Sequence, residues 1–283
     1  MKLGLVCKPD VERAFLVGRE IYDFLSNEPS CELVVHDRFS QGLKSVGIDA
    51  HGVTLEEMNG FAEVVVTVGG DGTILKALTK IDKPIFAINT GDLGFLTECE
   101  PKYAADGLKR VIAGDYIVQE RMKLKVTLDG RRLTDSANEV SIHSPQSARV
   151  IRLEFGVDGE VVETIKADGI IIAAPTGSTG YALSVGGPIL DPEIRGMVIA
   201  PIAPFRLSSR PIVVSSKRTA WIRVMPPSKQ STKPQDAKMV IDGLEEHGID
   251  SNSEVRITES EIKARFVRFG GDFYFRVRTK LTR

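Results

Sequence analysis

The sequence has few cysteines, few aromatic residues and almost no net charge. Cys7, Cys31 and Cys99 are widely spaced and odd in number, which argues against a disulfide framework. They show no metal-ligand spacing and favour reduced, buried thiols in a cytosolic protein. The net charge of -1 gives no general reason to expect binding to nucleic acid or to a membrane, because both usually need a basic face.

The chain also lacks a long apolar run. Residues 1–7 are interrupted too soon by Lys8 and Pro9 to form a signal peptide, and no apolar segment reaches membrane-spanning length. A length of 283 residues with 42% hydrophobic content suits a globular protein with two separate cores. We therefore expect a cytoplasmic protein of two domains.

The first hundred residues alternate between strand and helix signals, which predicts a Rossmann-like α/β domain over residues 1–100 with a parallel sheet. In such sheets ligands bind at the carboxyl ends of the strands. The expected strands cover residues 3–7, 33–35, 64–68 and 85–88, and a helix is expected over residues 11–25.

After residue 101 an amphipathic segment (103–112) is followed by many short strands. Asp-Gly pairs at 129–130 and 158–159 are hairpin signals. This pattern predicts a β-sandwich-type domain over residues 101–269, while residues 270–283 are expected to pack back on the first domain. The later strands are expected at 197–200, 211–214, 220–225, 239–241, 254–258 and 262–267, with an exposed loop at 226–234.

The most informative segment is Gly-Gly-Asp-Gly-Thr at residues 69–73. It follows an apolar strand and precedes apolar residues at helical spacing, with Thr73 available to cap the first turn. Glycines let backbone N–H groups approach an oxyanion at a helix N-terminus. Asp71 opposes that preference, so we expect it to take a proton from a hydroxyl or to hold Mg²⁺.

Two other interpretations of residues 69–73 are weaker. Asp-Gly is a frequent hairpin signal, but the residues that follow have helical periodicity. The segment is also not a Walker A loop, because no Gly-Lys-Ser/Thr follows.

Three further segments carry polar groups after or before apolar strands. Residues 89–97 place Asp92 between glycines, where it could face the first loop. Residues 168–188 open a buried strand into hydroxyls, glycines and the ring of Tyr181, which suit a nucleoside. Asn138 and Glu139, at a strand start, could read an adenine edge and a ribose diol, although each such segment alone is a weak signal.

Taken together, in this order and spacing, these segments resemble the NAD kinase family of the archaeal and bacterial type. The resemblance rests on residues 69–73, 89–96, 138–139, 168–188 and 207–211, and it covers most of the chain from Val64 onward. The Gly-Gly-Asp-Gly loop alone is shared with diacylglycerol kinase, sphingosine kinase and 6-phosphofructokinase relatives. The Asn-Glu pair and the Thr-Gly-Ser-Thr-Gly-Tyr loop narrow the resemblance to the NAD kinase family.

The resemblance implies Mg²⁺-dependent transfer of a phosphoryl group from ATP, or polyphosphate, to the adenosine-ribose 2′-hydroxyl of NAD, with NADP as product. It implies that Asp71 is the base, that NAD and ATP are the only partners besides copies of the chain in a dimer or tetramer, and that no protein site is dedicated to metal. The residues implied to bind substrate or nucleotide are Gly70, Gly72, Thr73, Lys76, Asn138, Glu139, Arg149, Lys166, Asp168, Thr179, Gly180, Tyr181 and Ser184.

Several alternatives stay open. Lys76, Arg149 and Lys166 could be ordinary solvated surface charges. The family's Asp-Gly-Gln is Asp-Gly-Leu244 here, and Phe205 stands where many members have His. A lipid kinase with an apolar acceptor pocket and a non-catalytic dinucleotide sensor are the competing functions.

Overall fold

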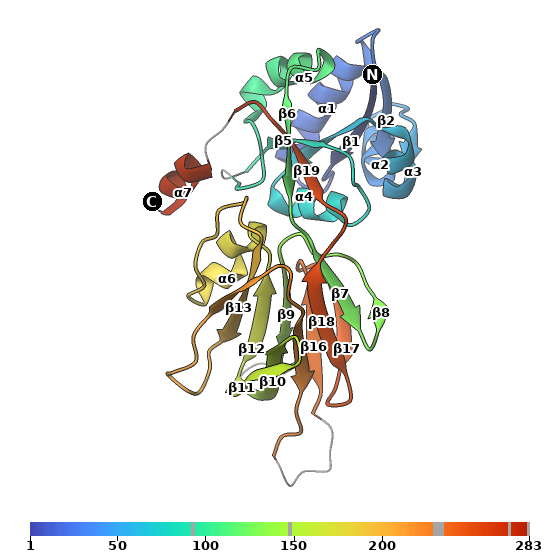
Figure 1. Cartoon of the computed structure of the whole chain (residues 1–283). Helices are drawn as coiled ribbons and strands as arrows, with labels where there is room; N and C mark the ends of the chain where they lie inside the picture. Colours follow the sequence, from blue (N-terminus) through green and yellow to red (C-terminus); the bar gives the residue numbers. More distant parts are fainter. Residues whose placement is uncertain (92–93, 147–148, 229–234, 271–272, 282–283) are drawn as a thin grey trace. The chain divides into compact units, whose positions relative to one another are not determined.

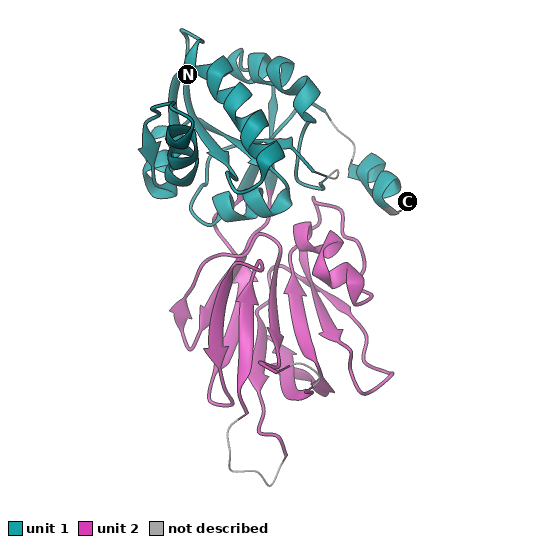
Figure 2. Ribbon diagram, turned by 180° about the vertical axis from the view of Figure 1, so that it is seen from behind, with its two compact units in different colours: residues 1–120, 264–283 teal, residues 121–263 magenta. Residues whose placement is uncertain are grey.

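The structure is a computed structural model that describes residues 1–91, 94–146, 149–228, 235–270 and 273–281, and it divides the chain into two compact units. Unit 1 comprises residues 1–120 and 264–283, and unit 2 comprises residues 121–263 (Figure 2). The boundaries differ from those predicted at 100 and 269, because β6 (Ile117–Arg121) and β19 (Ala264–Arg268) both join the sheet of unit 1.

Unit 1 is built on a seven-stranded sheet in the order β3-β2-β1-β4-β5-β19-β6 (Figure 1). Parallel pairing links β3, β2, β1, β4, β5 and β19, as predicted for an α/β domain. The strand order reverses between β1 and β4, which is where ligands bind in open α/β sheets. The first five strands are β1 (Lys2–Cys7), β2 (Glu32–His36), β3 (Gly52–Val53), β4 (Val64–Gly69) and β5 (Ile85–Asn89).

Helices bury one face of this sheet, where residues such as Phe39, Leu108 and Val111 join Leu5 and Val66 in one core. The helix at residues 11–25 is confirmed, whereas α2 and α3 were not predicted because each is short. Thr54 and Glu57 form a capping box at α3. The helices of unit 1 are α1 (Glu12–Ser26), α2 (Asp37–Ser45), α3 (Leu55–Phe61), α4 (Asp71–Leu78), η1 (Pro101–Tyr103), α5 (Ala104–Ile112) and α7 (Phe273–Leu281).

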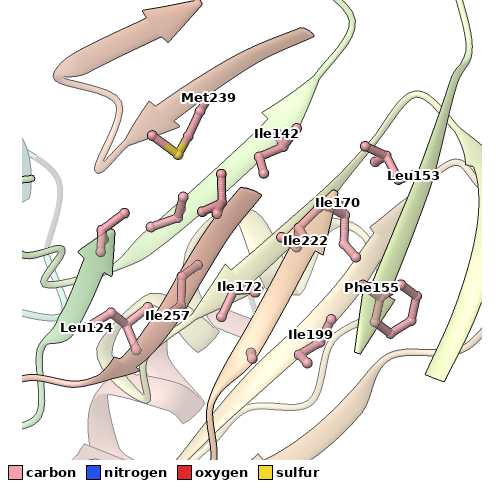
Figure 3. Packing of buried hydrophobic residues seen from close by; sticks show 14 of the residues in the cluster. Leu124, Ile142, Leu153, Phe155, Ile170, Ile172, Ile199, Ile222, Met239 and Ile257 are labelled. Atoms are coloured by element: carbon pink, nitrogen blue, oxygen red, sulfur yellow. The ribbon is translucent and has the colours of Figure 1, made fainter. Parts of the chain in front are cut away.

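Unit 2 consists of two six-stranded antiparallel sheets with one apolar core between them, which confirms the β-rich second domain. Figure 3 shows part of that core, where Leu153 and Phe155 of one sheet and Ile142 and Ile170 of the other are buried. One sheet has the order β11-β10-β15-β18-β7-β8 and the other β14-β13-β12-β9-β16-β17. Their strands are β7 (Leu124–Leu128), β8 (Arg131–Arg132), β9 (Glu139–His143), β10 (Ile151–Val157), β11 (Glu160–Ala167), β12 (Gly169–Ala173), β13 (Gly196–Ile202), β14 (Ile212–Ser215), β15 (Ala220–Val224), β16 (Ala237–Ile241), β17 (Glu245–Ile249) and β18 (Glu254–Glu259).

Both Asp-Gly hairpins are confirmed: one joins β7 to β8 and the other joins β10 to β11. Two details differ from the sequence prediction. The strand expected at residues 262–267 is β19, which pairs in parallel with β5 of unit 1 and does not belong to the β-domain. The strand β17 was missed because its sequence, Glu-Glu-His-Gly-Ile, is mostly polar.

The segment 176–190 covers the outer face of the second sheet. It contains η2 (Thr176–Thr179) and α6 (Tyr181–Ser184), and Ala182 and Leu190 pack there against Ile171 and Val198. This packing fixes the Thr/Ser-rich loop on the sheet that also carries β9. Across the described ranges, no helix combines the length and apolarity that crossing a membrane requires.

Candidate active site

The Gly-Gly-Asp-Gly loop of unit 1 is a tight connection between β4 and α4. The strand ends at the buried Gly69, and the helix begins at Asp71 with Gly70 as its N-cap. A side chain at Gly69 would overlap the Thr73 hydroxyl, so only glycine allows this turn. The prediction that Thr73 caps the helix was wrong, because Thr73 lies inside the first turn and the N-cap is Gly70. Lys76 lies in the last turn of α4.

The Asp71 carboxylate is held by the second predicted loop. Its Oδ2 accepts the N–H of Phe95 at 3.1 Å and its Oδ1 accepts the N–H of Leu96 at 3.3 Å. A Cβ atom at Gly94 would overlap Oδ1, so this approach also requires glycine. The two loops therefore meet at Asp71 itself. Asp92, which was expected to face the first loop, lies outside the described residues.

In unit 2, a buried carboxylate positions the Asn-Glu pair. Asp242 accepts the N–H groups of Ala137 (2.7 Å), Asn138 (2.8 Å) and Glu139 (3.0 Å), and the hydroxyl of Ser136 (2.5 Å). It occupies the left-handed region at φ 51°, in the turn between β16 and β17. The sequence did not indicate this role, because Asp242-Gly243 has the form of one more Asp-Gly turn.

The side chains of that pair carry buried acceptors without partners. Asn138 Oδ1 and Glu139 Oε2 are both buried, and neither has a hydrogen-bond partner in the part of the chain that the structure describes. A buried polar atom left unpaired costs roughly 1–3 kcal/mol. Two such acceptors on adjacent residues favour a site whose ligand supplies the missing donors.

Burial also changes the ionisation of both carboxyl groups. The pKa of Glu139 is raised to about 7, first by burial and then by the nearby charge of Asp242. Burial raises the pKa of Asp242 as well, against the opposing effect of its Ser136 and backbone donors. Glu139 can therefore change charge close to neutral pH, which is unusual for a carboxyl group.

The Thr/Ser-rich loop packs directly on this pair. A Cβ atom at Gly177 would overlap the carbonyl of Asn138, and one at Gly180 would lie 3.4 Å from Glu139 Oε2. The Ser178 hydroxyl donates to Pro175 O at 2.6 Å and accepts the N–H of Leu190 at 2.9 Å, which braces the loop. The structure thus brings residues 138–139 and 177–180 together.

The remaining polar groups of this loop are partly exposed. Thr179 donates its hydroxyl to Thr176 O and Ser184 to Tyr181 O, so the oxygen of each still has lone pairs to accept a hydrogen bond. The Tyr181 ring is 43% exposed at the start of α6. These side chains are therefore accessible to a ligand.

Four other predicted residues are exposed and are not bonded to the Asn-Glu pair within the described part of the chain: Arg149, Lys166, Asp168 and, in unit 1, Gly72. The Arg149 guanidinium donates to Gln146 Oε1 at 3.2 Å. The two departures from the family pattern are exposed as well. Leu244 follows the Asp242 turn, and Phe205 donates its backbone N–H to Lys166 O at 2.8 Å.

Both units match models of one enzyme family. Residues 3–116 match the ATP-NAD kinase N-terminal domain, and residues 137–269 match the ATP-NAD kinase C-terminal domain. The chain belongs to the NAD kinase family. The predicted resemblance is confirmed for both domains, including the first 60 residues on which the sequence motifs carried no information.

Full-length relatives agree with this assignment. The NAD kinase of Thermoplasma volcanium is 37% identical over 281 residues, which cover 99% of this chain and 98% of the relative. The crystal structure of an NAD kinase from Archaeoglobus fulgidus in complex with ATP is 31% identical, with a TM-score of 0.77 and coverage of 99% and 98%. Yeast NADH kinase complexed with NADH is 23% identical and has the same fold, with a TM-score of 0.90 and coverage of 100% and 87%.

Proposed function

We propose that this NAD kinase family chain transfers the terminal phosphoryl group of ATP, or of polyphosphate, to the adenosine-ribose 2′-hydroxyl of NAD and so produces NADP. The observation that carries the proposal is the pair of unpartnered buried acceptors, Asn138 Oδ1 and Glu139 Oε2. A ribose diol supplies hydroxyl donors and an adenine edge supplies an amino donor, which are the groups that this pair lacks.

The acceptor nucleoside is assigned to unit 2. Glu139 would accept from the ribose diol and Asn138 from the adenine, while the exposed ring of Tyr181 would cover one face of the base. Thr179, Gly180 and Ser184 lie in the same segment as Tyr181. As the family resemblance implies, Asp168 would lie near the second nucleoside, and Arg149 and Lys166 would contact ligand.

The reaction centre is assigned to Asp71. As the 2′-oxygen forms a bond to the γ-phosphorus of ATP, the bond from that phosphorus to the ADP oxygen breaks, and Asp71 takes the 2′-hydroxyl proton. Its two backbone donors leave carboxylate lone pairs for this proton. Gly70, Gly72 and Thr73 would lie against phosphates, with Lys76 supplying positive charge. Most of the rate would come from positioning and charge neutralisation.

Magnesium fits this site as an ion that arrives with the nucleotide. No cluster of three or more His, Cys, Asp or Glu side chains suited to a metal occurs in the part of the chain that the structure describes. Mg²⁺ in kinases is commonly held by one or two carboxylates together with substrate phosphates, and Asp71 offers one such carboxylate. When bound, the ion would neutralise phosphate charge during transfer.

A cytoplasmic location and a homo-oligomeric state belong to the same proposal. Cys7, Cys31 and Cys99 are all free, as expected of a protein in a reducing compartment. The oligomer is implied by the family alone.

The direct test is to incubate the protein with NAD, ATP and MgCl₂ and to measure NADP by an NADP-specific dehydrogenase. The wild type is expected to form NADP, and Asp71→Asn is expected to lose on the order of 10²- to 10⁴-fold in kcat. Asp106→Asn, which removes an exposed carboxylate from the same unit, is the matched control. Phosphorylation of diacylglycerol or a long-chain base in place of NAD would favour a lipid kinase, and binding of NAD without turnover would favour a sensor.

A further inference from the structure

Arg268 and Arg276, both near the C-terminus, form hydrogen bonds to the loop at residues 94–97. The backbone of this loop in turn binds the Asp71 carboxylate. Arg276 of α7 donates through Nη1 to the carbonyl of Gly94 at 3.4 Å and also to the carbonyl of Thr97. Arg268 at the end of β19 donates to the carbonyl of Leu96 at 3.1 Å. Three carbonyls within residues 94–97 are therefore fixed by two guanidinium groups that lie far away in the sequence.

A buried carboxylate joins the two arginines. Glu98 Oε2 lies 2.9 Å from Arg268 Nη1 and 3.5 Å from Arg276 Nη2, and the three side chains are 5 to 13% exposed. The backbone N–H of Phe269 donates to the other oxygen of Glu98 at 2.9 Å. Two positive charges thus share one negative charge in this cluster.

Asp71 supplies the second negative charge. Burial lowers the pKa of Arg268, and Glu98 and Asp71 both act electrostatically in the opposite direction, so Asp71 is within reach of this cluster. Arg268 Nη2 is buried and has no hydrogen-bond partner among the residues that the structure describes.

One peptide group links Arg276 to Asp71 directly. The carbonyl of Gly94 accepts from Arg276, and the N–H of Phe95, which belongs to the same peptide group, donates to Asp71 Oδ2 at 3.1 Å. A cation on the carbonyl side of an amide polarises it and makes its N–H a stronger donor. The guanidinium therefore acts on the carboxylate through four peptide atoms.

A ring pair and a cation–π contact hold α7 against the same loop. The rings of Phe273 and Phe95 have centroids 6.4 Å apart, and Lys280 Nζ lies 4.3 Å from the centroid of Phe95. These contacts place the backbone of Arg276, so its side chain can be replaced without removing the helix from the loop.

We propose that Arg276 is a positioning residue for phosphoryl transfer, which orients the base Asp71 through the Gly94–Phe95 peptide group. The inference rests on the proposed function, since it assigns Arg276 a part in the same reaction. The C-terminal helix α7 then has a role in turnover without touching substrate.

The test compares three full-length variants by steady-state kinetics with NAD, ATP and MgCl₂. Arg276→Gln is expected to lower kcat about 10- to 100-fold, as expected for a lost charge-assisted hydrogen bond, with KM for NAD and ATP within about twofold of wild type. Arg276→Lys restores a cation and is expected to recover part of kcat. Arg278→Gln removes the same charge from the same helix, where the guanidinium lies over Phe275, and is expected to leave kcat unchanged.

A second comparison separates positioning from simple stabilisation. In an Asp71→Asn background, Arg276→Gln is expected to have little further effect on the residual rate, because residues that act as a unit are non-additive. A full additional loss in that background, an unchanged kcat for Arg276→Gln, or equal losses for Arg276→Gln and Arg278→Gln would each overturn the inference while the enzyme remained an NAD kinase. An inactive wild type would instead remove the proposed function itself.

Discussion

The buried carboxylate of Asp242 accepts the backbone N–H of Glu139 at 3.0 Å, so one acidic residue fixes the position of another. The same contact brings two negative charges together, and burial with this repulsion raises the pKa of Glu139 to about 7. The arrangement holds Glu139 ready for a ligand at the cost of an easily protonated side chain.

NAD binding should therefore depend on pH near neutrality. An ionised Glu139 accepts both hydroxyls of a ribose diol, so the affinity for NAD is expected to rise as the pH increases from about 6 to about 8. The stability of the folded protein depends on pH in the opposite direction. The folded state keeps a proton on Glu139 between pH 4.5 and about 7, where the unfolded state has lost it. Glu139 therefore contributes to the free energy of unfolding below pH 4.5, and this contribution is lost as the pH rises through about 7.

Titration calorimetry with NAD across this pH range provides the measurement. Glu139→Gln keeps the shape of the side chain but cannot ionise, so its weaker affinity should be nearly independent of pH. A wild-type affinity that stays constant from pH 6 to 8 would contradict the assignment of Glu139 to the diol.

Glu139→Ala should raise KM for NAD with little change in KM for ATP. Equal changes in the two KM values would place Asn138 and Glu139 at the other nucleotide.

Asp242→Asn should weaken both stability and NAD binding. The amide keeps one acceptor oxygen and turns the other into a donor, so either the N–H of Ala137, on Oδ2, or those of Asn138 and Glu139, on Oδ1, lose their acceptor at about 1–3 kcal/mol for each group. Urea unfolding and KM for NAD measure the two effects. Asp236→Asn is the control, since Asp236 is exposed and lies just before β16, the strand that Asp242 follows. An Asp242→Asn variant with the same stability and the same KM for NAD as Asp236→Asn would refute the anchoring role.

The sequence predicted features that depend on neighbouring residues. Strand-helix alternation in the first hundred residues and the Asp-Gly hairpins could be predicted, because each depends on local periodicity or turn chemistry. The anchoring of Glu139 by Asp242 and the contacts of Arg276 were not, because each joins residues more than a hundred positions apart. Nothing in a local pattern distinguishes such an arginine from a solvated one.

The domain boundary illustrates the same limit. Residues 264–268 have an ordinary strand pattern, and only the fold shows that they return to β5 in the sheet of unit 1. The glycines indicated part of the site. Gly94 could be noticed in the second loop, but only the structure shows that a glycine is required there, because the Asp71 carboxylate lies against it.

Gly94→Ala is expected to lower kcat by a factor on the order of 10² while the protein stays folded. The added methyl group would overlap Asp71 Oδ1 and push the base from its two backbone donors, and small misplacements of catalytic groups have large effects on rate. Gly60→Ala, at an exposed helical position with open space around it, should leave kcat unchanged. Near wild-type kcat in Gly94→Ala would show that the Asp71 geometry is not needed for turnover.

NADP should bind as product and protect the protein against heat. If the Tyr181 ring covers the base and Thr179 and Ser184 bind the same nucleoside, NADP is also expected to inhibit competitively against NAD. A ligand at a hundredfold excess over its dissociation constant stabilises the folded state by about 2.7 kcal/mol. Tyr181→Ala should reduce the shift in melting temperature, whereas Tyr103→Ala, an exposed ring in unit 1, should not. If millimolar NADP gives no shift while a diacylglycerol or a long-chain base is phosphorylated, the acceptor is a lipid and the assignment of residues 138–139 and 177–184 to a dinucleotide fails.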